Sequence, residues 1–320
     1  MYLALLASAL LVGTLLAVQA SVNLQLNRAV GTPYGASTLQ LSVAAGLLLV
    51  ATLVVGSIGA LGDVSDVTWW HLLGGIASPI YITSGILLIP RLGAVTTVGL
   101  WVTGQMLASL VLDLGGFIGV KQVPINLLIV LGAAAVVAGI TVVVRGQNAA
   151  IKAGPGTAVA ADARPTLGSQ SGWLVLGVLA GGVLPVQGAI NAKLRADLHA
   201  PIAVALISFI VATLFIAIVL VILLAAKKTP QPKLSGLKGM PWWGWLGGAC
   251  AAIYVTVTFL LIPEIGAATT VAFTVLGQQL ASAVIDQNGF FRLPRRKLTA
   301  PRLIGVGLLI AGSILVQLAK

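Results

Sequence analysis

The chain has 320 residues, of which 58% are hydrophobic and only 8% are charged, and its formal net charge is +11 at pH 7. Soluble domains carry roughly a quarter charged residues, so this composition excludes an ordinary soluble domain and indicates a protein that spans the lipid bilayer. The positive charge does not indicate nucleic-acid binding, because basic residues commonly flank membrane spans and no basic surface rich in aromatic residues accompanies them.

Hydrophobic runs bounded by proline, charged residues and glycine-rich breaks predict about ten spans of bilayer length. The first run ends in Val-Gln-Ala like a cleaved signal peptide, but it has no basic n-region and its Gln-x-x-x-Asn pattern recurs inside the chain, so we interpret it as a span. In chain order the predicted spans cover residues 3–25, 35–60, 69–90, 93–112, 124–144, 171–193, 202–226, 242–262, 265–285 and 302–319.

One stretch of the chain occurs twice. Residues 69–117 match residues 242–290 at a constant shift of 173 residues, without a gap. The shift aligns Trp, Tyr, Pro, Gln and Asp residues, which apolar composition alone would not bring into register. We therefore predict a first five-helix repeat over residues 1–145, a flexible linker over 146–170 and a second five-helix repeat over 171–320.

The links between spans and the placement of basic residues predict the topology. Spans three and four of each repeat are joined by short links around Pro90–Gly93 and Pro263–Gly266, where proline should stop one helix and glycine should ease the turn. Because five is an odd number, two five-span repeats joined by one linker enter the membrane in opposite directions. The loops on the linker's side hold 14 of the 18 Lys and Arg residues, which indicates a cytoplasmic linker and both termini outside the cytoplasm.

Several short motifs recur in both halves. They are Q-x-x-x-N in span one, W-W at the start of span three, P-x-x-G-A between spans three and four, G-Q in span four and D-x-x-G-F after it. In combination they resemble the YdcZ-like family of bacterial inner-membrane proteins in the drug/metabolite transporter superfamily. The resemblance implies an all-α polytopic membrane protein with about ten transmembrane helices in two inverted five-helix repeats, fused in one chain. It also implies an exporter of small molecules in the inner (plasma) membrane, although ten-helix relatives usually keep both termini in the cytoplasm.

Uncharged polar and aromatic side chains within the spans are the candidate substrate-binding residues. Gln19 and Asn23 lie four residues apart and share one helix face, as do their counterparts Gln187 and Asn191 in the second repeat. Carboxamides can bind a polar solute, but they can equally hold neighbouring helices together, and both interpretations stay open. The other candidates, from spans three, four, eight and nine, are Tyr81, Trp101, Gln105, Tyr254 and Gln278.

Two duplicated acids are the candidates for coupling transport to an ion. Asp113 and Asp286 close spans four and nine, where an acid can relay protons but where D-x-x-G also favours a turn, and we favour the turn. We expect His71 and His199 to be loop or interface residues without an acidic partner. The positive surroundings of Asp286 are expected to come from the basic residues that follow it, Arg292, Arg295, Arg296 and Lys297.

These patterns favour a secondary transporter that moves a small polar or amphipathic solute by alternating access. A flippase of lipid-linked substrates would instead need a lateral, lipid-facing opening lined by polar residues. A membrane scaffold or accessory subunit would bury the amides in helix contacts and have no central cavity. The single cysteine, Cys250, and the few ionisable residues argue against an enzyme, a metal site and a cofactor. The expected partners are a small-molecule substrate and the lipid bilayer, with a homodimer left open.

The charge distribution makes a direct prediction about topology. Alkaline phosphatase fused after Lys320 should be active, because this end of the chain is expected outside the cytoplasm, whereas the same fusion near Gly156 should be inactive. Enzymatic activity of the two fusions in whole cells measures this. The opposite pattern would reverse the orientation and leave the inverted repeats unaffected.

Overall fold

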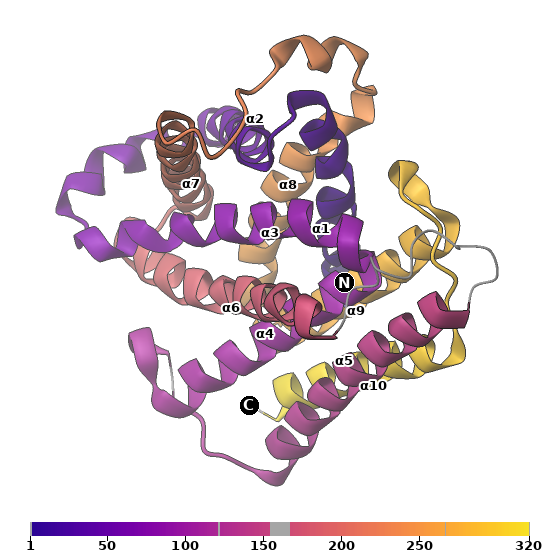
Figure 1. Ribbon diagram of the computed structural model, residues 1–320. Helices are drawn as coiled ribbons and strands as arrows, with labels where there is room; N and C mark the ends of the chain where they lie inside the picture. The colour runs from indigo at the N-terminus through magenta and orange to yellow at the C-terminus, as the bar shows by residue number, and fades with distance from the viewer. Residues whose placement is uncertain (1, 121, 154–166, 266, 320) are drawn as a thin grey trace.

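The computed structural model describes residues 2–120, 122–153, 167–265 and 267–319. Over these ranges the chain forms α-helices joined by short links and 3₁₀-helices, without a β-strand (Figure 1). The α-helices are α1 (Tyr2–Val30), α2 (Pro33–Val54), α3 (Ala77–Leu92), α4 (Ala94–Gly115), α5 (Leu127–Ala153), α6 (Leu167–Leu198), α7 (Pro201–Ala225), α8 (Leu246–Ile265), α9 (Ala267–Asn288) and α10 (Ala300–Leu318).

The helices have the length and composition of membrane spans. Among the described residues, 8 helical segments are long and apolar enough to cross a bilayer. Helices α8 and α9 lie at the two remaining predicted positions, 242–262 and 265–285. Large apolar side chains such as Leu214 and Val221 of α7 are exposed on the outside of the bundle, as helices surrounded by lipid require. The prediction of an all-α polytopic membrane protein is confirmed.

Two helix boundaries differ from the sequence prediction. The second span ends at Val54, and a 3₁₀-helix, η1 (Ile58–Asp66), occupies the end of the predicted range. Proline was expected to stop the third span, but Pro90 lies inside α3, and the helix continues to the single linking residue Gly93. Gly93 has a φ of 80°, which a continuing α-helix cannot contain, so the glycine and not the proline ends the helix.

The helices around the predicted linker are longer than expected. Helix α5 continues to Ala153 and α6 begins at Leu167, so residues 146–153 and 167–170 at the two ends of the predicted linker are helical. The centre of the predicted linker, residues 154–166, lies outside the described residues.

In the packing of the two repeats, the first helix of each repeat contacts helices of the other repeat. Helix α1 packs on α8 and α9 of the second repeat, and its counterpart α6 packs on α3 and α4 of the first. Helix α5 packs on α10 (side by side in Figure 1), and α2 packs on its own counterpart, α7. The contacts of α1 therefore have equivalents in the contacts of α6, and the α5–α10 and α2–α7 contacts each join a helix to its own counterpart. Two repeats related by a pseudo-two-fold axis give this pattern. The prediction of two repeats is confirmed.

Glycines set the helix separation at the exchanged contacts. A methyl group added to Gly13 of α1 would overlap the backbone of Thr274 in α9. At the equivalent place in the other repeat, a methyl group on Gly181 of α6 would overlap the backbone of Trp101 in α4. Close backbone approach through small residues is a main source of helix association in membranes. The duplicated sequence thus fixes the same short separation on both sides of the pseudo-axis.

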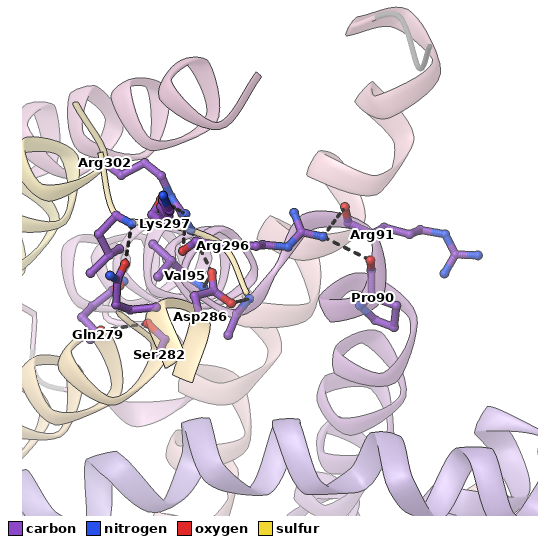
Figure 2. A network of polar contacts seen from close by, with 12 residues as sticks. Pro90, Arg91, Val95, Gln279, Ser282, Asp286, Arg296, Lys297 and Arg302 are labelled. Carbon is purple, nitrogen blue, oxygen red and sulfur yellow. Dashed lines mark hydrogen bonds and ion pairs between the residues drawn. The ribbon is translucent and has the colours of Figure 1, made fainter. Parts of the chain in front are cut away.

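A buried ion pair of the second repeat contacts the first repeat at one end of the bundle. The Nη2 atom of Arg302 in α10 donates to Oδ2 of Asp286 in α9 at 2.8 Å, and both side chains are 2% exposed. The same carboxylate accepts hydrogen bonds from the backbone N–H groups of Ala94 at 2.9 Å and Val95 at 3.1 Å. Figure 2 shows this arrangement. An acid of the second repeat thereby caps the N-terminus of α4 in the first, where the helix dipole favours an anion.

Arg296, in the link between α9 and α10, extends this contact to the end of α3. Its backbone N–H donates to the backbone oxygen of Asp286 at 2.7 Å, and its Nη2 donates to the backbone oxygens of Pro90 at 3.2 Å and Arg91 at 3.3 Å. Burial and the nearby charge of Arg302 lower the pKa of Arg296, and the Asp286 carboxylate opposes this shift. We call Asp286, Arg296, Arg302 and the N-terminus of α4 the Asp286 cluster.

The sequence prediction of which basic residues surround Asp286 was wrong in one respect. The residue that forms the ion pair is Arg302, which was not among the four basic residues proposed from the sequence. Arg302 lies in the first turn of α10, and α10 packs directly on α9. By contrast, Arg295 in the link after α9 donates from Nε to the backbone oxygen of Asn288 at 3.1 Å, and therefore binds the end of α9.

The Asp286 cluster makes a prediction about stability. Arg302→Met should lower the free energy of unfolding by about 3–5 kcal/mol, because it leaves the Asp286 carboxylate buried without its partner charge. Adding Asp286→Asn should restore part of this loss, since asparagine removes the charge and keeps an acceptor for the N-terminus of α4. Unfolding of the detergent-purified protein measures both effects, with Asp113→Asn as the control at the duplicate position. A fully stable Arg302→Met variant, or a double variant no more stable than the single one, would contradict this account.

Candidate functional site

A cavity of about 430 Å³ lies between the two repeats. Its walls are built from both halves of the chain, chiefly the middle of α1, the start of α3, the second half of α4, the second half of α6 and the middle of α8. The structure brings most of the predicted site residues to this cavity: Gln19, Tyr81, Gln105, Asp113, Gln187, Asn191 and Tyr254.

Two of the remaining candidates support a cavity residue from behind. Trp101 is 0% exposed, its ring centroid lies 4.1 Å from that of Tyr81, and its Nε1 donates to Oγ of Ser84 at 3.1 Å. Gln278 donates from Nε2 to the hydroxyl of Tyr81 at 2.8 Å. Neither residue lines the cavity, and their contacts fix the orientation of the Tyr81 ring that does.

The duplicated asparagines hold helices together. Asn191 donates from Nδ2 to Oγ of Ser208 at 3.2 Å, and Asn23 donates from Nδ2 to Oε1 of Gln40 at 3.4 Å. Substituents added to Gly74 and Gly247 would overlap the Oδ1 atoms of Asn191 and Asn23 respectively, so each asparagine sits tightly against a glycine. Asn23 does not line the cavity, and its contacts are those of an interhelical hydrogen bond. Asn191 makes the same type of contact at the cavity's edge.

The glutamines leave hydrogen-bonding capacity inside the cavity. Gln187 donates from Nε2 to Oγ of Ser78 at 2.8 Å. For its counterpart Gln19, the position equivalent to Ser78 is Ala251, which offers no side-chain hydroxyl, and the Oε1 atom of Gln19 has no hydrogen-bond partner. The Nε2 atom of Gln105 is also buried without a partner. An unpaired buried amide costs about 1–3 kcal/mol, and a bound polar solute would remove that cost.

The two duplicated acids have different surroundings. Asp113 lines the cavity together with Arg195 and receives a hydrogen bond from Oγ of Ser109 at 3.3 Å. Asp286 does not line the cavity and belongs to the Asp286 cluster. Both aspartates lie in the last turn of their helices, and the glycine of each D-x-x-G motif, Gly116 or Gly289, has a positive φ just after the helix ends.

The expectation that His71 lacks an acidic partner was wrong. Its Nδ1 lies 2.5 Å from Oδ2 of Asp197, so the 3₁₀-helix η2 (Trp69–Ile76) is tied to the last turn of α6 in the other repeat. The two residues are 126 positions apart, and neither is duplicated, because Gly244 and Ala29 occupy the equivalent places. The internal repeat therefore carried no signal for this pair.

The sequence analysis also missed five polar residues of the cavity wall, namely Ser78, Ser109, Arg195, Thr258 and Gln317. Arg195 carried a usable signal, since it is one of only 4 basic residues on the sparsely charged side of the membrane. Ser78 carried a weaker one, as its counterpart is an alanine. Gln317 lies near the end of α10, where nothing in the pattern distinguished it from an interfacial residue.

The comparisons with known proteins agree with this arrangement. The family model described as "Putative inner membrane exporter, YdcZ" matches residues 4–142 and 172–315, which correspond to the two repeats. A solved structure titled only "Crystal structure of protein" is similar over 98% of this chain and 95% of that chain, with a TM-score of 0.55 and 17% identity, which shows a shared fold. No curated protein matches the sequence significantly. Because the matched ranges cover most of the chain, it belongs to the YdcZ family of multi-pass inner-membrane proteins.

Proposed function

We propose that the protein is a secondary transporter that exports a small polar or amphipathic solute by alternating access between its two repeats. The observation that carries this proposal is the cavity of about 430 Å³ between the repeats, with unpaired amide atoms of Gln19 and Gln105 buried beside it. Amides offer both donors and acceptors, so they can bind a polar solute without a formal charge. The family's description as an exporter supports the direction of transport.

The two ends of α4 have different surroundings, and this difference supports the alternating-access mechanism. On α4 the lining residues run from Gln105 to Asp113, whereas the Asp286 cluster holds the opposite end of the same helix at Ala94. Alternating access requires that a central site be closed at one end while the other is open. The arrangement fits a state closed at the Asp286 cluster. On the charge distribution of the sequence, the Asp113 end is the outer one, and this state faces outward.

If transport is coupled to protons through a carboxylate, Asp113 is a better candidate than Asp286. The Asp286 carboxylate already binds Arg302 and two backbone N–H groups, so releasing it for proton transport would cost these contacts. Asp113 lines the cavity that a solute would enter. Because no acid lies in the middle of a predicted span, we favour transport that is uncoupled or coupled to something other than protons.

The two alternatives receive less support. A scaffold was expected to lack a central cavity, and one lies between the repeats. A flippase was expected to have a lateral opening lined by polar residues, whereas the groove on the outside of α3, α4 and α6 has Gln187 as the single polar side chain among its lining residues. No specific contact favours either function over transport of a solute.

The duplicated glutamines Gln105 and Gln278 provide a matched test. A transported solute is first identified by thermal shift of the purified protein across a metabolite panel, and its flux is then measured in proteoliposomes. Gln105→Leu should reduce this flux about tenfold, equivalent to ~1.4 kcal/mol, and keep the melting temperature of wild type, because it removes a donor that no protein group uses. Gln278→Leu should lower the melting temperature, because it breaks the bond to Tyr81. A fully active Gln105→Leu variant, or no flux of any solute, would overturn the proposed function.

A pH gradient tests the coupling. Flux of the identified solute in proteoliposomes should be the same with and without an imposed gradient, because neither acid lies in the middle of a predicted span. If the gradient instead drives uphill flux, Asp113→Asn should abolish that flux. Uphill flux that survives in Asp113→Asn and disappears in Asp286→Asn would show that the roles of the two acids were assigned wrongly.

A further inference from the structure

A second concavity, of about 550 Å³, lies on the outside of the bundle between α3, α4 and α6. We call it the lateral groove. Its walls include Leu107 and Val111 of α4 and Leu179 of α6, which are 40%, 60% and 64% exposed. These helices have the length and composition to cross a bilayer, so the lateral groove faces the hydrocarbon of the membrane.

The lateral groove and the central cavity meet at the seam between α3 and α6. On α3, Ala77 lines the groove and the next residue, Ser78, lines the cavity. On α6, Val186 lines the groove and Gln187 lines both spaces. The hydrogen bond of 2.8 Å between Gln187 and Ser78 closes the seam. Hydrogen bonds between neutral side chains in membranes are individually weak, so this contact does not lock the two side chains together.

The equivalent seam on the other side of the pseudo-axis is built differently. There Gln19 of α1 faces α8, where Ala251 occupies the position equivalent to Ser78 and has no side-chain group for a hydrogen bond. A polar contact that can open and close is therefore present on the α3–α6 side, which is also the side that carries the lateral groove.

The two adjoining spaces suit a ligand with two parts. Moving an alkyl chain from lipid into polar surroundings is unfavourable, and the cost grows with each CH₂ group. A chain lying in the lateral groove avoids this cost, because it stays among apolar side chains while its polar head reaches the amides of Gln105 and Gln187. Ser78, Gln187 and Gln105 carry no formal charge, and the two charged residues that line the cavity, Asp113 and Arg195, have opposite signs, so a neutral head fits there.

We propose that the lateral groove holds the alkyl tail of a neutral amphipathic substrate whose polar head occupies the central cavity. The seam between Ser78 and Gln187 parts to let the tail remain in the groove while the head binds. This inference rests on the proposed function and narrows its substrate class to neutral molecules with one alkyl chain.

The test compares two probes that differ only in chain length, radiolabelled N-butanoylethanolamine and N-decanoylethanolamine, bound to the protein in nanodiscs. Leu107→Trp fills the lateral groove. The control is Leu280→Trp, the duplicate position in α9, where the leucine is 45% exposed against 40% for Leu107 but does not line the groove. Leu107→Trp should bind the short probe like wild type and the long probe at least tenfold more weakly. Leu280→Trp should bind both probes like wild type.

Four results would overturn the inference. The first is that wild type binds neither probe, and the second is that Leu107→Trp weakens the binding of both probes equally. The third is that Leu107→Trp weakens the binding of neither probe, which would mean that the groove holds only bilayer lipid. The fourth is that Leu107→Trp changes the oligomeric state, which would mean that a second copy of the chain covers the groove.

The result of this binding test can be distinguished from the result of the transport test of the proposed function. Binding of the probes as expected, combined with no flux of any solute in proteoliposomes, would retain the groove assignment and refute transport. Flux of tail-free polar solutes, combined with no binding of the long probe, would retain transport and refute the groove.

Discussion

The close approach of helices from opposite repeats is the constraint on which the rest of the structure depends. Lipid chains are as apolar as leucine side chains, so the hydrophobic effect does not drive these helices together, and packing of backbone against backbone has to do so. Gly13 and Gly181 allow this at equivalent contacts of α1 with α9 and of α6 with α4. Because each repeat supplies the helix that the other packs on, the cavity is enclosed by both and belongs to neither.

The duplication explains the framework, and the differences between duplicates explain the site. Gln105 keeps a free donor near the cavity, whereas its counterpart Gln278 uses the same atom to hold Tyr81. Asp113 lies on the cavity wall, whereas Asp286 is buried against a guanidinium and a helix end. In each case the backbone position is the same and the neighbours differ. A pseudo-symmetric scaffold thus carries an asymmetric set of polar groups.

The sequence predicted those features of the structure that depend on patterns of residues close together in the chain or on the internal repeat. Runs of apolar residues locate the helices, the constant shift of 173 residues identifies the repeats, and the single link at Gly93 follows from a glycine that can adopt a positive φ. Polar and aromatic residues at equivalent places in the spans identified 7 of the 26 residues of the cavity wall. Long-range pairs were not accessible in this way. Arg302 reaches Asp286, and His71 reaches Asp197, only because α9, α10, α6 and η2 pack in a particular order, and neither pair follows a duplicated pattern.

The cap that Asp286 places on α4 has a consequence for how the chain is assembled during synthesis. The carboxylate and the N–H group of Ala94 are 192 residues apart, so the ribosome completes α4 long before α9 is made. Until then, the N-terminus of α4 must be satisfied by water or by lipid head groups. The cap on α4 therefore forms only after the second repeat has been made, and the first repeat cannot reach its final structure alone.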